Sequence, residues 1–357
     1  MRRIRRSAAA AVAATAAAAL LPASPVSASA SASAPASASA SHRGHPEKHR
    51  HDEFTFAVIG DIPYGDAQIA NFPNVIKQIN ADPQVQFVDH LGDIKSGSTV
   101  CSDSYFAQIK AQFDTFEDPL VYTVGDNEWT DCHRPNNGSY NPLERLAKIR
   151  DVFFPHPGYT LGEHPVRVRS QAAEGIPEDV SYDRAGVSFA ALHIVGSNNS
   201  LAPWTGNLGP TPEQTAEVLS RTAAVIESVH ETFQRAREEH HRAVVLLTQA
   251  DMFDPTVPDL SFADYFAFQP IVQAIARESA AFGKPVYLFN GDSHVYNSDK
   301  PLAPGSSWLS FYGVSTPAPN LSRVTVDGST AVNNYLRVTV EPHSQAVLSW
   351  TRVPFTS

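Results

Sequence analysis

Four segments of this chain end in a Gly-Asp pair that follows a short apolar run. The segments are FAVIGD, VDHLGD, VYTVGD and VYLFNGDSH, and their aspartates are Asp61, Asp93, Asp126 and Asp292. A short run rich in Val, Ile, Leu and Phe is typical of a buried strand, and glycine permits the sharp turn after it. In an α/β sheet the C-terminal strand ends share one edge, so the pattern predicts four carboxylates gathered there. Carboxylates brought so close repel each other, and bound divalent cations usually offset this repulsion.

The order and spacing of these pairs resemble the calcineurin-like metallophosphoesterases, a superfamily that includes the purple acid phosphatases. The family pattern reads D-x-H, G-D, G-N-H-[D/E], a strand ending in His, and G-H-x-H. The corresponding stretches here are Asp61 to Pro63, Gly92-Asp93, Gly125 to Glu128, Val244 to Gln249, and Gly291 to His294. The resemblance covers residues 54 to 353. It implies an α/β fold, the calcineurin-like four-layer αββα sandwich of two mixed β-sheets flanked by helices.

Several ligands of that family are changed in this chain. Pro63 stands at the first-block His and cannot bind a metal, while Asp126 stands at the metal-binding Asn. Asn127 replaces the His that polarises the substrate or protonates the leaving group. Gln249 occupies the strand-end His position, and Asp292 replaces the first His of G-H-x-H. The outright matches are Asp61, Asp93 and His294.

Carried over by position, the resemblance implies two divalent ions bridged by Asp93. The first ion would be held by Asp61, Asp93 and His294. The second would be held by Asp93, Asp126, Asp292 and the Gln249 carbonyl. This oxygen-rich set suits Mg²⁺, Mn²⁺ or Ca²⁺ better than Zn²⁺. Ser96 stands where the purple acid subgroup has its iron-binding Tyr, so that subgroup is not expected. The alternative is the same fold with one weak metal or none.

The resemblance implies a metal-dependent phosphoesterase that hydrolyses a small-molecule phosphate ester with a metal-activated water. The alternative is a catalytically weak or inactive binding protein with the same fold. Three residues are catalytic candidates. Asn127 can donate a hydrogen bond to phosphate but cannot act as a general acid. Lys95 is either a phosphate contact or a solvent-facing loop lysine, and His133 either supplies the missing proton or is a surface histidine.

The N-terminal segment predicts export. Four arginines within residues 2–6 precede an Ala-rich run over 8–21 and a small-residue stretch that ends near residue 30. Residues 1–30 are therefore expected to be a signal peptide, too weakly apolar for a membrane anchor, and the protein to be secreted. Residues 31–52 are rich in Ser and Ala and then in His, and are expected to be a disordered spacer. Residues 53–357 would be the metallophosphoesterase domain.

The net charge bears on partners. The whole chain has a formal net charge of −10, and removal of residues 1–30 would take away four arginines and no acidic residue. Such an acidic chain is not expected to bind nucleic acid or anionic membranes by broad electrostatics. The sequence leaves the oligomeric state open.

Apolar runs and helical patterns alternate along the domain. Expected strands cover 54–60, 85–92, 119–124, 187–196, 243–249 and 285–290, and expected helices cover 67–80, 103–115, 142–152, 211–240 and 268–282. Strands near 321–326, 331–341 and 346–353 follow, in a part expected to be antiparallel.

The chain has two cysteines, Cys101 and Cys132, each in a loop beyond an expected strand end. In an exported chain a disulfide between them is favoured over two free thiols.

Overall fold

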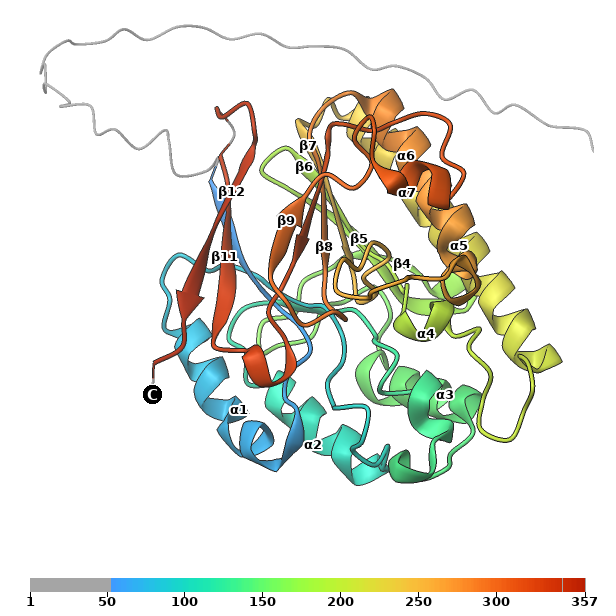
Figure 1. Cartoon of the computed structure of the whole chain (residues 1–357). Helices are drawn as coiled ribbons and strands as arrows, with labels where there is room; N and C mark the ends of the chain where they lie inside the picture. The colour runs from blue at the N-terminus through green and yellow to red at the C-terminus, as the bar shows by residue number, and fades with distance from the viewer. Residues whose placement is uncertain (1–52, 342, 357) are drawn as a thin grey trace, which may run out of the picture. The chain divides into compact units, whose positions relative to one another are not determined.

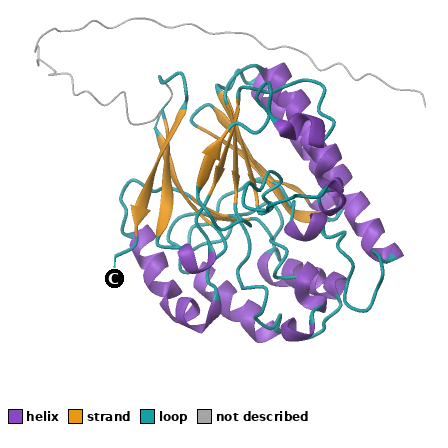
Figure 2. Ribbon diagram, viewed as in Figure 1, coloured by secondary structure: helices purple, strands orange, loops and turns teal. Residues whose placement is uncertain are grey.

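The computed structural model describes residues 53–341 and 343–356. The expected signal peptide over residues 1–30 and the expected spacer over 31–52 lie outside the described residues. Within them, two sheets face each other between two groups of helices (Figures 1 and 2). This is the predicted sandwich of two mixed sheets flanked by helices, and the fold class is confirmed.

The first sheet has the strand order β12-β11-β1-β2-β3. Its parallel strands are β1 (Phe54–Ile59), β2 (Val88–His90) and β3 (Leu120–Tyr122). The strands β11 (Asn334–Val340) and β12 (Leu348–Pro354) extend it in antiparallel pairing. All six residues of β1 are buried, because the sheet is covered on both faces.

The second sheet has the order β4-β5-β6-β7-β8-β10-β9. Its centre is the parallel set β6 (Val187–Ala191), β7 (Ala243–Thr248), β8 (Val286–Asn290) and β10 (Leu321–Thr325). Antiparallel strands lie at its edges, namely β4 (Arg169–Gln171), β5 (Ile176–Arg184) and β9 (Asn297–Asp299). The sheet therefore presents several C-terminal strand ends at one edge.

Three apolar layers hold the sandwich together. Helices α1 (Gly65–Asn80), α2 (Asp103–Phe113) and α3 (Pro142–Phe153) pack on the outer face of the first sheet. Helices α5 (Pro212–Glu238), α6 (Gln269–Phe282) and α7 (Ser307–Phe311) pack on the outer face of the second. Between the sheets, Phe56 of β1 meets Phe189 of β6 edge to face, with ring centroids 5.4 Å apart. No helix among the described residues has the length and apolar character of a membrane span.

Local sequence signals set the helix boundaries where they are strongest. The Thr211 side chain caps α5 by accepting a hydrogen bond from the Gln214 backbone N–H, and the Gln214 side chain accepts one from the Thr211 backbone N–H. Pro212 begins the helix. The predicted helices over 67–80, 103–115, 142–152, 211–240 and 268–282 are all present within a few residues.

Some expectations about strands are wrong. The expected strand 187–196 stops at Ala191, and its last residue begins the short turn α4 (Gly196–Asn199). The strand β10 was expected in an antiparallel part but runs parallel to β8. The strands β4, β5 and β9 were not predicted, because polar residues interrupt their apolar pattern. The strands β4 and β9 are the two edge strands of the sheet, and β5 lies between β4 and β6.

Candidate metal centre

The candidate ligands converge from both sheets. Asp61, Asp93 and Asp126 follow β1, β2 and β3 of the first sheet, while Asp292 and His294 follow β8 of the second. The prediction that all four carboxylates share one sheet edge is therefore wrong in detail. They meet because the C-terminal ends of the two parallel sets face each other across the sandwich.

The backbone at these positions is shaped for close approach. Four of the candidate ligands have left-handed backbone conformations, with φ of 52° at Asp61, 54° at Asp93, 73° at Asp292 and 63° at His294. Such angles are uncommon outside glycine and gather at functional sites. At Gly196 an added Cβ would lie 2.7 Å from Asp126 Oδ2 and 2.9 Å from Asp292 Oδ1, so a larger residue there would displace these carboxylates.

Two overlapping groups of ligand atoms result. The first comprises Asp61, Asp93 and His294, and the second comprises Asp93, Asp126 and Asp292. Within each group the candidate ligand atoms lie within 4.8 Å of one another. Asp93 belongs to both groups, as a residue that bridges two ions must.

Buried carboxylates lie close together in this cluster, and a bound cation would offset their mutual repulsion. Burial, followed by the charges of Asp126 and Glu128, raises the pKa of Asp93 well above its usual value. Burial and the charges of Asp126 and Asp61 do the same to the pKa of Asp292. Burial also raises the pKa of Asp61, against the opposing hydrogen bond from His294. These carboxylates, with a single imidazole, fit hard divalent cations such as Mg²⁺, Mn²⁺ or Ca²⁺.

Gln249, predicted to offer its carbonyl to the second ion, lies beside the second group of candidate ligands. Its side-chain Oε1 accepts from the Gly196 N–H at 2.7 Å, and its backbone oxygen accepts from the Gly291 N–H at 3.0 Å. Its Nε2 donates to Asp292 Oδ1 at 3.0 Å and to Asp126 Oδ1 at 3.3 Å. Each carbonyl oxygen thus accepts from a backbone donor, and the Gln249 amide group presents a hydrogen-bond donor to the second group of candidate ligands.

Asn127, one of the three catalytic candidates, contacts the candidate ligand Asp93. Its Nδ2 donates to Asp93 Oδ2 at 2.6 Å and to the Tyr64 hydroxyl at 2.8 Å. The Tyr64 hydroxyl in turn donates to Asp93 Oδ2 at 2.7 Å and lies 3.4 Å from His294 Nε2. Tyr64 is a site residue whose role the sequence pattern did not identify. Its one signal is its position immediately after the Asp61 block.

Lys95 matches neither of its two predicted environments. The side chain is fully buried, so it is not a solvent-facing loop lysine. Its ammonium donates to the Asn127 backbone oxygen at 2.6 Å and to Asn137 Oδ1 at 3.0 Å, which also leaves it unsuited to contact a phosphate. Burial lowers the pKa of Lys95 to about 8 despite the neighbouring Glu128 charge. Lys95 therefore fixes the position of Asn127.

His133 is held by a neighbouring loop. Its Nδ1 accepts from the Thr205 backbone N–H at 2.8 Å, and the Thr205 hydroxyl lies at the same distance. Partial burial, with the charge of Arg134, lowers the pKa of His133. Both features favour the neutral ring, so His133 is a poor proton donor, and the prediction that it supplies the missing proton is not supported by its surroundings.

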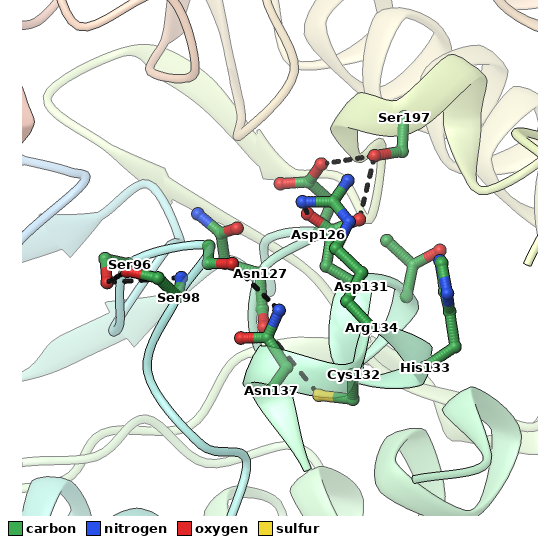
Figure 3. A network of polar contacts seen from close by, with 12 residues as sticks. Ser96, Ser98, Asp126, Asn127, Asp131, Cys132, His133, Arg134, Asn137 and Ser197 are labelled. Carbon is green, nitrogen blue, oxygen red and sulfur yellow. Dashed lines mark hydrogen bonds and ion pairs between the residues drawn. The ribbon is translucent and has the colours of Figure 1, made fainter. Parts of the chain in front are cut away.

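A polar network extends the site beyond the ligands. The Ser197 hydroxyl donates to Asp126 Oδ2 at 2.8 Å and to Asp131 Oδ1 at 3.1 Å (Figure 3). Asp131 also forms an ion pair with Arg134 at 2.5 Å. Neither Asp131 nor Arg134 was predicted, because each follows the third Gly-Asp block in a stretch with no regular pattern.

Loops around the site are linked covalently. Cys101 and Cys132 form the predicted disulfide, with Cα atoms 5.9 Å apart. It joins the loop that begins at Asp93 to the 3-10 turn Thr130–His133 after Asp126. Glu128 adds a second link, since its Oε1 accepts from the backbone N–H groups of Asp93 and Gly125.

Comparisons with known proteins found a family model and similar solved structures. Residues 54–195 match the model of the family described as calcineurin-like phosphoesterase. One similar solved structure is described as "GAP50 the anchor in the inner membrane complex of Plasmodium". It has 8% sequence identity, a TM-score of 0.39, and coverage of 85% of this chain and 90% of that chain. A likeness at that TM-score carries no argument. No curated protein matches the chain.

Proposed function

Because residues 54–195 match the family model described as calcineurin-like phosphoesterase, we propose that this chain is a metal-dependent hydrolase of small-molecule phosphate esters. The observation that carries the proposal is the pair of ligand groups sharing Asp93. Divalent ions bound there lower the pKa of water and neutralise charge that grows on phosphoryl oxygens.

The residues of the chain have separate tasks in this reaction. Asp61, Asp93 and His294 would hold one ion, and Asp93, Asp126 and Asp292 the other. Asn127 and Tyr64 orient the shared Asp93 carboxylate through hydrogen bonds of 2.6 and 2.7 Å. Asn127 has no proton to release near neutral pH, so esters with a good leaving group are the expected substrates.

One observation favours a second candidate, a catalytically weak binding protein with one metal. The Gln249 amide already donates to Asp126 and Asp292, and these bonds stabilise the second group of ligands without an ion. The two candidates differ in turnover.

The test is hydrolysis of 4-nitrophenyl phosphate by the metal-free protein after addition of Mn²⁺, Mg²⁺ or Ca²⁺. The phosphoesterase predicts turnover that needs the added ion, stops on chelation and is lost in Asp93→Asn. If a correctly folded, metal-loaded protein hydrolyses no activated monoester or diester, the binding protein is the better description.

We also propose that the protein is exported. The Arg- and Ala-rich N-terminal sequence motivates this proposal, and the Cys101–Cys132 disulfide supports it because disulfides persist in oxidising compartments. Mass spectrometry of the culture medium should find chains cleaved near residue 30, whereas a full-length chain retained in the cytoplasm would contradict export.

A further inference from the structure

Arg134 is a partly exposed cation attached to the metal centre by two side chains. Its guanidinium pairs with Asp131 Oδ2, and Ser197 connects Asp131 Oδ1 to the ligand Asp126. The Arg134 side chain keeps 42% of its surface exposed, while the Asp131 side chain keeps only 4%. Figure 3 shows Arg134 extending from its turn toward this network. One end of the ion pair is thus fixed in the protein and the other faces solvent.

Gly97 leaves a space between Arg134 and Asn127. A Cβ added at Gly97 would lie 2.9 Å from Asn127 Oδ1 and 3.5 Å from Arg134 Nη1. The amide and the guanidinium therefore border the same small space, and glycine keeps it open. Asn137 fixes the Gly97 backbone, since its Nδ2 donates to the Gly97 oxygen at 2.8 Å.

Other cations around the centre are already used. Lys95 is fully buried and donates to Asn127 and Asn137. Arg323 is also fully buried, and it binds Asp251 and Asp299. By contrast, Arg134 pairs with Asp131 through Nη1, and a guanidinium carries further donors on Nη2 and Nε.

We propose that Arg134 binds terminal phosphoryl oxygens of the substrate and thereby selects phosphate monoesters. This rests on the proposed function, and it names the substrate class. A guanidinium presents a planar fork of N–H groups that matches two oxygens of one phosphoryl group. A monoester has three terminal phosphoryl oxygens, whereas a diester has two. A monoester would therefore have one more oxygen with which to accept hydrogen bonds from Arg134.

The test compares Arg134→Gln with a matched control, Arg352→Gln. Arg352 is similarly exposed, at 45% of its side chain, and also pairs with a buried carboxylate, that of Asp327. Inorganic phosphate is titrated into the Mn²⁺-loaded proteins by calorimetry, and the metal content is measured in parallel. We expect phosphate affinity to fall roughly tenfold to a hundredfold in Arg134→Gln, as for loss of charged hydrogen bonds. It should be unchanged in Arg352→Gln.

Kinetics separate substrate binding from a merely structural role. In Arg134→Gln the KM for 4-nitrophenyl phosphate should rise more than kcat falls, and hydrolysis of bis(4-nitrophenyl) phosphate should change little. Arg134→Lys, which keeps the charge but loses the fork, should recover part of the phosphate affinity. Gly97→Ala should also weaken phosphate binding, because its methyl group enters the space beside Asn127.

Wild-type phosphate affinity in Arg134→Gln would overturn the proposal, as would equal losses for monoester and diester. Failure of the proposed function would give a different experimental result. A protein that hydrolyses no ester but binds phosphate through Arg134 would retain this inference and lose the enzymatic activity.

Discussion

At the scale of single residues, two amides determine what this centre can do. An amide can donate and accept hydrogen bonds, but it has no proton to lose near neutral pH. The Asn127 amide donates to the shared ligand Asp93, and the Gln249 amide donates to Asp126 and Asp292. Both side chains hold carboxylates in place through hydrogen bonds.

Replacing Asn127 by His should change the dependence on the leaving group. In the wild type, rates should fall steeply as the leaving alcohol becomes more basic, because no nearby group protonates it. Asn127→His should flatten that slope. The measurement is a series of aryl and alkyl phosphates for both proteins, and equal slopes would show that position 127 does not face the leaving group.

Replacing Gln249 by His should strengthen the second metal site. The imidazole would replace an amide donor by a metal ligand, and nitrogen favours Zn²⁺ more than the carboxylates do. Metal analysis after dialysis should find more ion per chain in Gln249→His than in wild type, with a shift toward zinc. Gln171→His, on the edge strand β4, serves as the control. Identical metal content in all three proteins would contradict this assignment of Gln249.

The sequence predicted the cluster of candidate ligands better than its surroundings. Asp61, Asp93, Asp126, Asp292 and His294, which the structure brings together, each follow an apolar strand at a regular position. The hydrogen bonds of Gln249 and the burial of Lys95 depend on which loops meet, and local sequence does not encode this. The contact of Tyr64 with Asp93 likewise joins two separate segments of the chain. The ion pair of Arg134 with Asp131 is local, and it was missed because it lies in a stretch with no regular pattern.

At the scale of elements, the loops after β2 and β3 act as one unit. The Cys101–Cys132 disulfide joins them, and Lys95 and Asn137 add hydrogen bonds across the same junction. This unit carries Asn127 and Arg134. The links between these loops therefore help to position both Asn127, which contacts Asp93, and Arg134, the proposed phosphate contact.

Removal of the disulfide should destabilise this unit. The Cys101→Ser, Cys132→Ser double variant should lose about 3–4 kcal/mol of unfolding free energy, given a sequence separation of 31 residues. Urea unfolding of the oxidised wild type and the double variant measures the difference, and reductant should affect only the wild type. Two freely alkylated thiols in the native wild type would contradict the pairing.

Helices and strands with a continuous apolar pattern could be predicted from the sequence. Strands that form because a neighbouring strand pairs with them could not. The helix α5 carries its own start signal, and the buried runs of β1, β7 and β8 have the length of strands. By contrast, β5 is interrupted by Glu178, Asp179 and Asp183, and it is a strand because β6 pairs with it. Pairing between distant segments overrides local pattern there.

At the scale of the whole molecule, a polar contact crosses the apolar layer between the sheets. The Tyr182 hydroxyl of β5 donates to both Asp89 oxygens of β2, at 3.0 and 3.1 Å. Burial raises the pKa of Asp89 to about 8, against the opposing hydrogen bond. The carboxyl group is therefore protonated in the folded protein at neutral pH.

This contact predicts a pH-dependent loss of stability. The folded pKa of Asp89 lies above its unfolded value, so its stabilising contribution is complete below pH 4 and is lost as pH rises toward 8. Asp89→Asn needs no proton and should lack this loss. Between pH 5 and pH 8 the variant should gain up to about 4 kcal/mol relative to wild type in urea unfolding. Parallel pH profiles for the two proteins would contradict the shifted pKa.

The arrangement of the whole molecule is what makes the metal centre. Neither sheet alone contains a full set of ligands, because the second group takes Asp93 and Asp126 from one sheet and Asp292 from the other. The sequence revealed the fold through the resemblance of its five blocks. The division of ligands between two sheets follows from the strand order, which local patterns do not specify.

Metal stoichiometry tests the central claim, that Asp93 joins two ion sites between the sheets, most directly. Metal-free protein is loaded with Mn²⁺, freed of unbound ion, and analysed for bound metal beside Asp93→Asn. The wild type should retain about one to two ions per chain, the second more weakly held, and Asp93→Asn should lose affinity at both sites while remaining folded. Absence of bound metal under every loading condition, or Asp93→Asn with wild-type metal content, would contradict the account.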